Sequence, residues 1–198
     1  MTGLNRLALP FVISAGLVLG SAAAAIAQED GYFPNTKRQG RAAVEYRDAE
    51  IHVVAAYTYS QQNHDSRWLL IETAISTTQN MTIDRQDIRL VAPDGRSVML
   101  SSQDRFAADA ARLQVLLQNA SVTRHNVLSY FNQRRAAERM RLFALNSGSV
   151  LTNFVTDENH VAAGDLFFES PTGSWDAGVY SLIIEKDGVR AVLPIELQ

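Results

Sequence analysis

An arginine-rich stretch between residues 105 and 145 is the part of this sequence best suited to chemistry with another molecule. It holds seven arginines and two acidic residues, a formal charge of +5. Planar guanidinium groups bind carboxylates and phosphates through paired hydrogen bonds. Five of these arginines have few acids near them in the sequence and form the predicted partner-binding surface: Arg124, Arg134, Arg135, Arg139 and Arg141.

Two histidine-containing turns could supply metal ligands. His64 with Asp65, and His160 with Asp157, combine imidazole nitrogen with carboxylate oxygen, as mixed-donor transition-metal sites do. Neither turn has the second histidine or the cysteines whose spacing is typical of zinc sites. We therefore expect solvated turns, with no metal and no other cofactor.

Common catalytic motifs are missing from the sequence. Ser147 and Ser149 flank Gly148, but the patterns G-x-S-x-G, S-x-x-K and H-E-x-x-H do not occur. Glu72 and Glu169 are the two acids that merit examination as a carboxylate pair, and both are expected to point from strands into solvent. We predict no catalytic residue. An envelope hydrolase with an unrecognised site is kept as an alternative.

Aromatic side chains suggest a further alternative. Tyr57, Tyr59 and Trp68 lie in or beside predicted strands, and a line of exposed rings on one sheet face would make a carbohydrate-binding module. Trp175, in a turn, could also stack on a sugar, although a tryptophan there more often closes the end of a core.

The first 27 residues predict a cleaved signal peptide. Arg6 precedes the apolar run Leu7–Leu19, and Ala25–Ala27 has the small-x-small pattern of a cleavage site. We expect a periplasmic or extracellular location after cleavage. A membrane-spanning helix needs about 20 apolar residues, so we expect no integral membrane segment after signal removal. The chain has no cysteine, which excludes disulfides and a lipid-modified cysteine.

Alternation of apolar residues with period two predicts strands in much of the remaining chain. The turn at Ala92–Arg96, with its proline and glycine, should join two of them as a hairpin. Pro194 has no amide donor and should lie at a sheet edge. Residues 28–47 show no sustained period and are expected to form a polar N-terminal arm. Strands are predicted over residues 51–59, 69–75, 88–91, 98–100, 166–168, 179–185 and 189–197.

The period changes to three and four residues after Phe106, which predicts a helix to about Leu117 with Asp104 as its N-cap. A second helix is predicted from Thr123 toward Leu145, although Met140–Leu145 could instead be a strand. The two helices form an insertion at about residues 103–146. Many short strands and one helical insertion favour a mainly β fold in which two sheets form a sandwich.

The segment Asp176–Leu182, with sequence DAGVYSL, resembles the D-x-G-x-Y-x-C entry to the penultimate strand of immunoglobulin-like domains. Leu182 replaces the cysteine. Residues 68–75, 88–95 and 164–168 also resemble exported bacterial immunoglobulin-like domains of the immunoprotective-antigen type. The resemblance implies an immunoglobulin-like antiparallel β-sandwich over residues 48–198, a Tyr180 hydroxyl bonded to backbone and Leu182 in the core. It implies a binding or structural module and names no ligand.

The expected function is that of an exported, non-catalytic binding or assembly module that docks through the arginine-rich insertion. Outside residues 105–145, the chain that remains after signal removal carries a charge of −9. The expected partner is an envelope protein or an anionic envelope polymer, and a homodimer would use the same complementarity. Alternatively, the arginines are solvated or pack on acids of the same molecule. Nucleic acid is not expected, because the exported chain is acidic.

Overall fold

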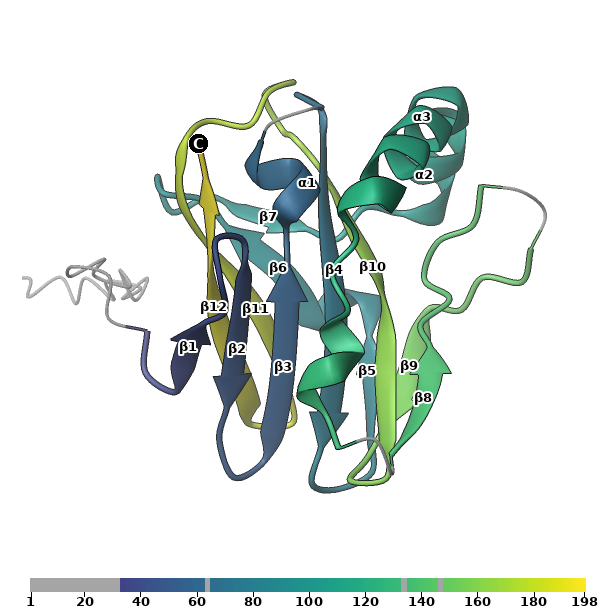
Figure 1. Ribbon diagram of the computed structural model, residues 1–198. Coiled ribbons are helices and arrows are strands. Elements are labelled where there is room, and N and C mark those ends of the chain that lie inside the picture. The colour runs from purple at the N-terminus through teal and green to yellow at the C-terminus, as the bar shows by residue number, and fades with distance from the viewer. Residues whose placement is uncertain (1–32, 63–64, 133–134, 146–147) are drawn as a thin grey trace, which may run out of the picture.

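Strands predominate in the computed structural model, which describes residues 33–62, 65–132, 135–145 and 148–198. The prediction of a mainly β protein is therefore confirmed. The predicted signal peptide lies outside the described residues. Two larger sheets share one hydrophobic core, and a two-stranded sheet lies at their edge (Figure 1). No helix among the described residues is long and apolar enough to cross a membrane.

The first sheet has six strands, and all neighbours are antiparallel except β8, which runs parallel to β10. The prediction of a loose arm over residues 28–47 is wrong for β1 and β2. Ala42, Val44 and Tyr46 are buried in the core, so this short segment gains enough apolar burial to join the sheet. In spatial order the strands are β1 (Thr36–Arg38), β2 (Ala43–Arg47), β3 (Ile51–Ala56), β4 (Trp68–Thr77), β10 (His160–Glu169) and β8 (Ala136–Arg139).

The second sheet confirms the predicted hairpin and the predicted edge strand. Its order is β12 (Val189–Leu197), β11 (Gly178–Lys186), β6 (Ile88–Val91) and β7 (Ser97–Met99). Leu90 pairs with Val98 across the hairpin, and Gly95 adopts a φ of +85° in its turn. Pro194 lies in β12, at the edge. The small sheet pairs β5 (Met81–Asp84) with β9 (Asn153–Thr156), and the 3₁₀ turn η1 (Arg85–Asp87) follows β5.

The core between the two larger sheets closes around the corner that precedes β11. The Tyr180 hydroxyl donates a hydrogen bond to the Asp176 carbonyl at 3.0 Å, and Leu182 is fully buried. Trp175 is also buried, and its Nε1 donates to the Arg67 carbonyl while its ring packs edge-on against Tyr180. Trp175 therefore closes the core and is not an exposed stacking platform.

The outer face of the six-stranded sheet is also covered. All six residues of β3 and all ten of β4 are buried, so these strands pack on both faces. Two separate apolar clusters form there, one around Trp68, Leu70 and Phe167 and one around Val54 and Ala74. The covering elements, shown in Figure 1, are α1 (Thr58–Gln61), α2 (Gln103–Ala108), α3 (Ala110–Ala120), η2 (Ser121–Thr123) and η3 (Val127–Tyr130).

The helical insertion differs from its prediction in two ways. The first helix breaks into α2 and α3 at Asp109, which accepts a hydrogen bond from Trp68 Nε1 at 2.7 Å. Ser102, rather than Asp104, is its N-cap, because the Ser102 hydroxyl accepts from the Arg105 amide.

The prediction of a second helix from Thr123 toward Leu145 is wrong. The described residues there contain short 3₁₀ turns and then β8. Met140 and Leu142 are buried while Arg139 and Arg141 are exposed, an alternation of period two that suits an extended chain beside β10. The Met140 amide donates to the Ala163 carbonyl, which continues the contact with β10 past the end of β8. The segment Met140–Leu145 is thus neither helix nor strand.

We predict that Tyr180→Phe lowers the free energy of unfolding by about 1 kcal/mol, because the variant loses the part-buried hydrogen bond from this buried side chain to the Asp176 carbonyl. Urea unfolding followed by circular dichroism measures the change. Val115→Ala, at an exposed position of α3, is the control and should leave stability unchanged. Equal stability of wild type and Tyr180→Phe would contradict a structural role for this bond.

Candidate functional site

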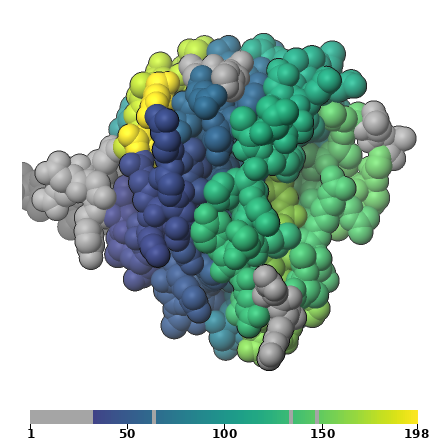
Figure 2. All heavy atoms as spheres, in the orientation of Figure 1, coloured from purple at the N-terminus to yellow at the C-terminus, as the bar shows by residue number. Residues whose placement is uncertain are grey.

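A groove of about 790 Å³ opens on the outer face of the six-stranded sheet. Figure 2 shows it as a hollow between the residues that follow α3 and the segment that continues β8, with part of β10 visible at its floor. Its volume lies in the range of about 300–1,000 Å³ that is usual for small-molecule sites. The groove lies where the two outer apolar clusters leave the sheet uncovered.

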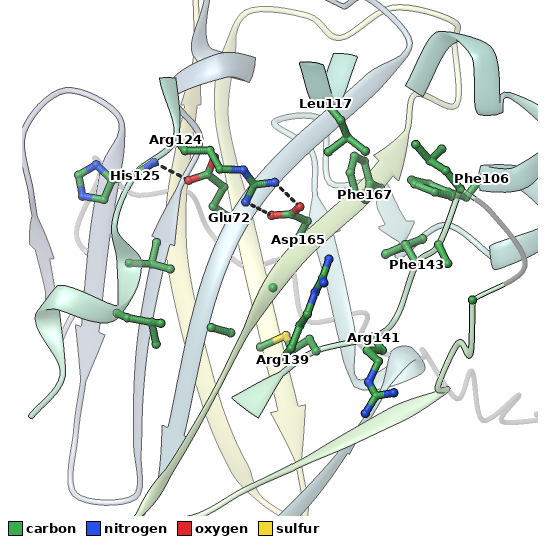
Figure 3. Close-up of a pocket in the computed structure, with 18 of the residues that line it drawn as sticks. Glu72, Phe106, Leu117, Arg124, His125, Arg139, Arg141, Phe143, Asp165 and Phe167 are labelled. Atoms are coloured by element: carbon green, nitrogen blue, oxygen red, sulfur yellow. Dashed lines mark hydrogen bonds and ion pairs between the residues drawn. The ribbon is translucent and has the colours of Figure 1, made fainter. Parts of the chain in front are cut away.

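Two carboxylates on neighbouring strands form the polar part of the floor. Glu72 of β4 is paired directly with Asp165 of β10 in the antiparallel ladder, so both side chains lie on the outer face. Arg124, which follows η2, donates from Nη1 and Nη2 to the two Asp165 oxygens at 3.0 and 2.6 Å (Figure 3). The His125 amide donates to Glu72 Oε2 at 2.6 Å. These bonds fix residues 124 and 125 over the acid pair.

The two acids have different electrostatic surroundings. Glu72 is only 7% exposed, and burial raises the pKa of its carboxyl, with an opposing effect from the His125 amide and Arg124. The hydrogen bond to Asp165 raises the pKa of Arg124, which therefore stays charged and neutralises Asp165. The expectation that Glu72 points to solvent is wrong, because its face of β4 is covered on both sides of it by apolar side chains.

Two arginines lie on the opposite side of the groove: Arg139 is the last residue of β8, and Arg141 lies two residues after it. Arg139 and Arg141 are exposed, and their side chains have no hydrogen-bond or ion-pair partner among the residues that the structure describes. In Figure 3 the Arg139 guanidinium is directed toward Asp165, whereas that of Arg141 is directed away. The lining contains these two arginines, Arg124 and two carboxylates, which sum to a formal charge of +1. The groove is therefore suited to an anion near Arg139.

An apolar wall bounds one end of the groove. The rings of Phe106, Phe143 and Phe167 contact one another, with centroid distances of 4.8 to 5.2 Å, and Leu117 lies beside them (Figure 3). Gly164 of β10 allows the segment that contains Met140 and leads to Phe143 to lie close to β10, since a Cβ at position 164 would lie 2.6 Å from Met140 Cβ. The site thus combines an apolar end with charged groups of both signs.

The structure divides the predicted arginine surface. Arg124 is paired with Asp165, and Arg135 donates to Ser76 Oγ at 2.5 Å. Arg134 lies outside the described residues. Arg139 and Arg141 line the groove and have no partner within residues 33–62, 65–132, 135–145 and 148–198. Elsewhere in the insertion, Arg105 and Arg112 pair with acids of the same molecule, Glu169 and Asp65, as the alternative interpretation expected.

Of the other sequence candidates, Ser149 also lines the groove, whereas Glu169 and His160 do not. Glu169 binds Arg67 and Arg105, and His160 is paired with Asp157 within its own turn. His64 and Ser147 lie outside the described residues. No group of three or more metal-ligating side chains occurs within the described part of the chain.

The aromatic alternative loses its exposed platform. Tyr57, Tyr59 and Trp68 have exposures of 2%, 6% and 1%, so they form no line of rings open to a sugar. Their burial follows from the cover on the outer face and from the core between the sheets.

Sequence reasoning missed the partnership of Glu72 with Asp165. A usable signal was present, because each is an acid on an otherwise apolar strand face: Leu70 and Ala74 flank Glu72, and Phe167 and Ala163 flank Asp165. Such acids are retained against a desolvation cost and commonly mark a site.

Comparisons with known proteins identify no family. No family model matches the chain, and no curated protein matches it. The crystal structure of the yjhA protein from Bacillus subtilis is 10% identical to this chain, covers 78% of it and 96% of its own length, and superposes with a TM-score of 0.39. This degree of similarity carries no argument about function.

From the ion pairs of Glu169 we predict how the free energy of unfolding changes at acidic pH. Arg105, followed by Arg67, holds the pKa of Glu169 below its ordinary value. A carboxyl whose pKa is lowered by folding stabilises the protein above its unfolded pKa of about 4.3, and this contribution disappears as the pH falls through the folded pKa. The unfolding free energy of wild type should therefore decrease more steeply below about pH 5 than that of Glu169→Gln. Urea unfolding across this range measures both slopes, and equal slopes would refute the assignment.

Proposed function

We propose that this protein is an exported, non-catalytic binding module whose groove takes a ligand with an anionic group and an apolar group. Export rests on the signal-peptide pattern of residues 1–27. The observation that carries the binding function is Arg139, an arginine to which the described part of the chain offers no partner and which is directed into a groove with an aromatic wall. Envelope molecules, including segments of envelope proteins, are the proposed source of the ligand.

The arrangement of the groove supports binding without a large rearrangement. Arg124 and the His125 amide are already bonded to Asp165 and Glu72, so one wall is fixed before a ligand arrives. Preorganisation of this kind reduces the entropy lost on binding. Because Arg124 neutralises Asp165, Arg139 can attract an anion with less opposition from the floor.

We propose that the fold belongs to the immunoglobulin-like class. Such a fold suits a binding module. The Tyr180–Asp176 hydrogen bond and buried Leu182 support this proposal, since both belong to the corner motif of that class. The six-stranded sheet and the parallel strand β8 are departures from the common pattern. They build the edge beside which the groove forms.

The proposed site predicts saturable binding of 8-anilinonaphthalene-1-sulfonate, a probe that is both aromatic and anionic. Arg139→Gln should weaken this binding at least about tenfold, because a hydrogen bond to a charged group contributes roughly 1.5–3 kcal/mol. A fluorescence titration of the folded protein measures the dissociation constant. Circular dichroism and urea unfolding establish that each variant is folded.

Arg47→Gln is the matched control, because Arg47 is an exposed arginine on β2, separated from β4 by β3. It should bind the probe as wild type does. Equal affinities of wild type and Arg139→Gln, or the lack of saturable binding by wild type, would reject the proposed function.

A further inference from the structure

Glu72 presents an unused hydrogen-bond acceptor to the groove. Its Oε2 accepts from the His125 amide, but none of the described residues donates to Oε1. The side chain is more than nine-tenths buried and lines the groove. Among the described residues, Thr73 Oγ1 is the buried side-chain atom that has no hydrogen-bond partner, so Glu72 Oε1 is still in contact with solvent. A ligand that covers this oxygen removes it from water, which is unfavourable unless the ligand supplies an N–H donor in its place.

Arg139, on the other side of the acid pair, requires a hydrogen-bond acceptor from the ligand. Its guanidinium has donors but no acceptor among the described residues, and it is directed toward the same part of the groove (Figure 3). Asp165 lies between these two groups but is occupied through both oxygens by Arg124. The complementary ligand therefore carries an N–H donor for Glu72 and an anion for Arg139.

The apolar end adds a third requirement. Leu117 and Phe143 are only partly buried and line the groove beside the fully buried Phe106 and Phe167. A ligand with an apolar group would remove this surface from water. The last residue of a peptide carries all three features on one carbon atom: an amide N–H, a carboxylate and a side chain. A fatty acid has no N–H, so it would leave Glu72 Oε1 without a donor.

We propose that the groove binds the free carboxyl end of a peptide whose last side chain is apolar. The terminal carboxylate lies on Arg139, the last amide N–H donates to Glu72 Oε1, and the side chain packs against Phe143 and Leu117. This inference rests on the proposed function and specifies its ligand. It makes Glu72 a residue that determines specificity and has no part in catalysis.

Three peptides that differ in single groups test the proposal. The first is N-acetyl-Ala-Ala-Phe. The second carries a C-terminal amide in place of the carboxylate, and the third is the ester analogue that ends in phenyllactate and so lacks only the last N–H. Isothermal titration should show that the amide and the ester each bind about tenfold or more weakly than the acid, as expected for the loss of one hydrogen bond to a charged group.

Two variants assign these losses to residues. In Glu72→Gln, the side-chain oxygen must stay on the His125 amide, which turns the NH₂ group toward the ligand. The preference for the acid over the ester should therefore disappear or reverse. In Arg139→Gln, the preference for the acid over the C-terminal amide should disappear. Urea unfolding establishes that each variant is folded.

Each contrary outcome overturns a stated part of the proposal. Equal binding of acid and ester by wild type would remove the role of Glu72, and equal binding of acid and amide would remove the terminal carboxylate. If dodecanoate binds as tightly as the peptide and its affinity is unchanged in Glu72→Gln, the ligand is an amphiphile and the peptide assignment is wrong. If no peptide binds but the fluorescent sulfonate binds and responds to Arg139→Gln, the peptide inference fails while the proposed function stands. If neither binds, both fail.

Discussion

Cover on the outer face of the six-stranded sheet is the constraint on which the rest of the structure depends. β3 and β4 are buried on both faces, so the sheet needs a second layer in addition to the opposing sheet. The helices α2 and α3 cover one apolar cluster, and η3 covers the other. Between them the face is charged, and apolar side chains cannot cover Glu72 and Asp165 without a large desolvation cost. The groove is the result.

The same charged pair anchors the chain that crosses it. Arg124 and the His125 amide donate hydrogen bonds to Asp165 and to one oxygen of Glu72. These bonds fix the segment that connects α3 to η3, the elements that cover the two apolar clusters. Charge-assisted hydrogen bonds of this kind are stronger than neutral ones, especially when partly buried. The fold therefore uses one arginine of the insertion to build the groove, while Arg139, on the other side, has no partner among the residues that the structure describes.

Local chemistry made much of the fold predictable. Pro194 marked an edge strand and the turn around Gly95 marked a hairpin, because each depends on a few neighbouring residues. The corner at Tyr180 was expected from the resemblance of Asp176–Leu182 to immunoglobulin-like domains. The prediction of a second helix failed because the four-residue spacing of Val127 and Phe131, which is typical of a helix, arises here by chance. In the protein they anchor a 3₁₀ turn on the outer cluster. Tertiary packing overrode the local period there.

The site was less predictable, since it depends on register between strands far apart in sequence. Glu72 faces Asp165 because β4 pairs with β10 in one register, which neither strand specifies alone. The charge of the insertion indicated a basic surface that included Arg139, but sequence could not reveal that Arg124 has an internal partner. Because Arg124 and Arg135 bind other side chains of the same molecule, the predicted arginine surface is reduced to Arg139 and Arg141 on one side of the groove.

Hydrogen exchange at the His125 amide, followed by NMR, tests most directly whether the acid pair holds the cover in place. Because this amide donates to a buried carboxylate, the account predicts that it exchanges at least about tenfold more slowly than in an unstructured peptide. In Glu72→Ala that protection should be lost, while the Leu182 amide in β11 stays protected. Free exchange at His125 in the wild type, or full protection in Glu72→Ala, would contradict the account.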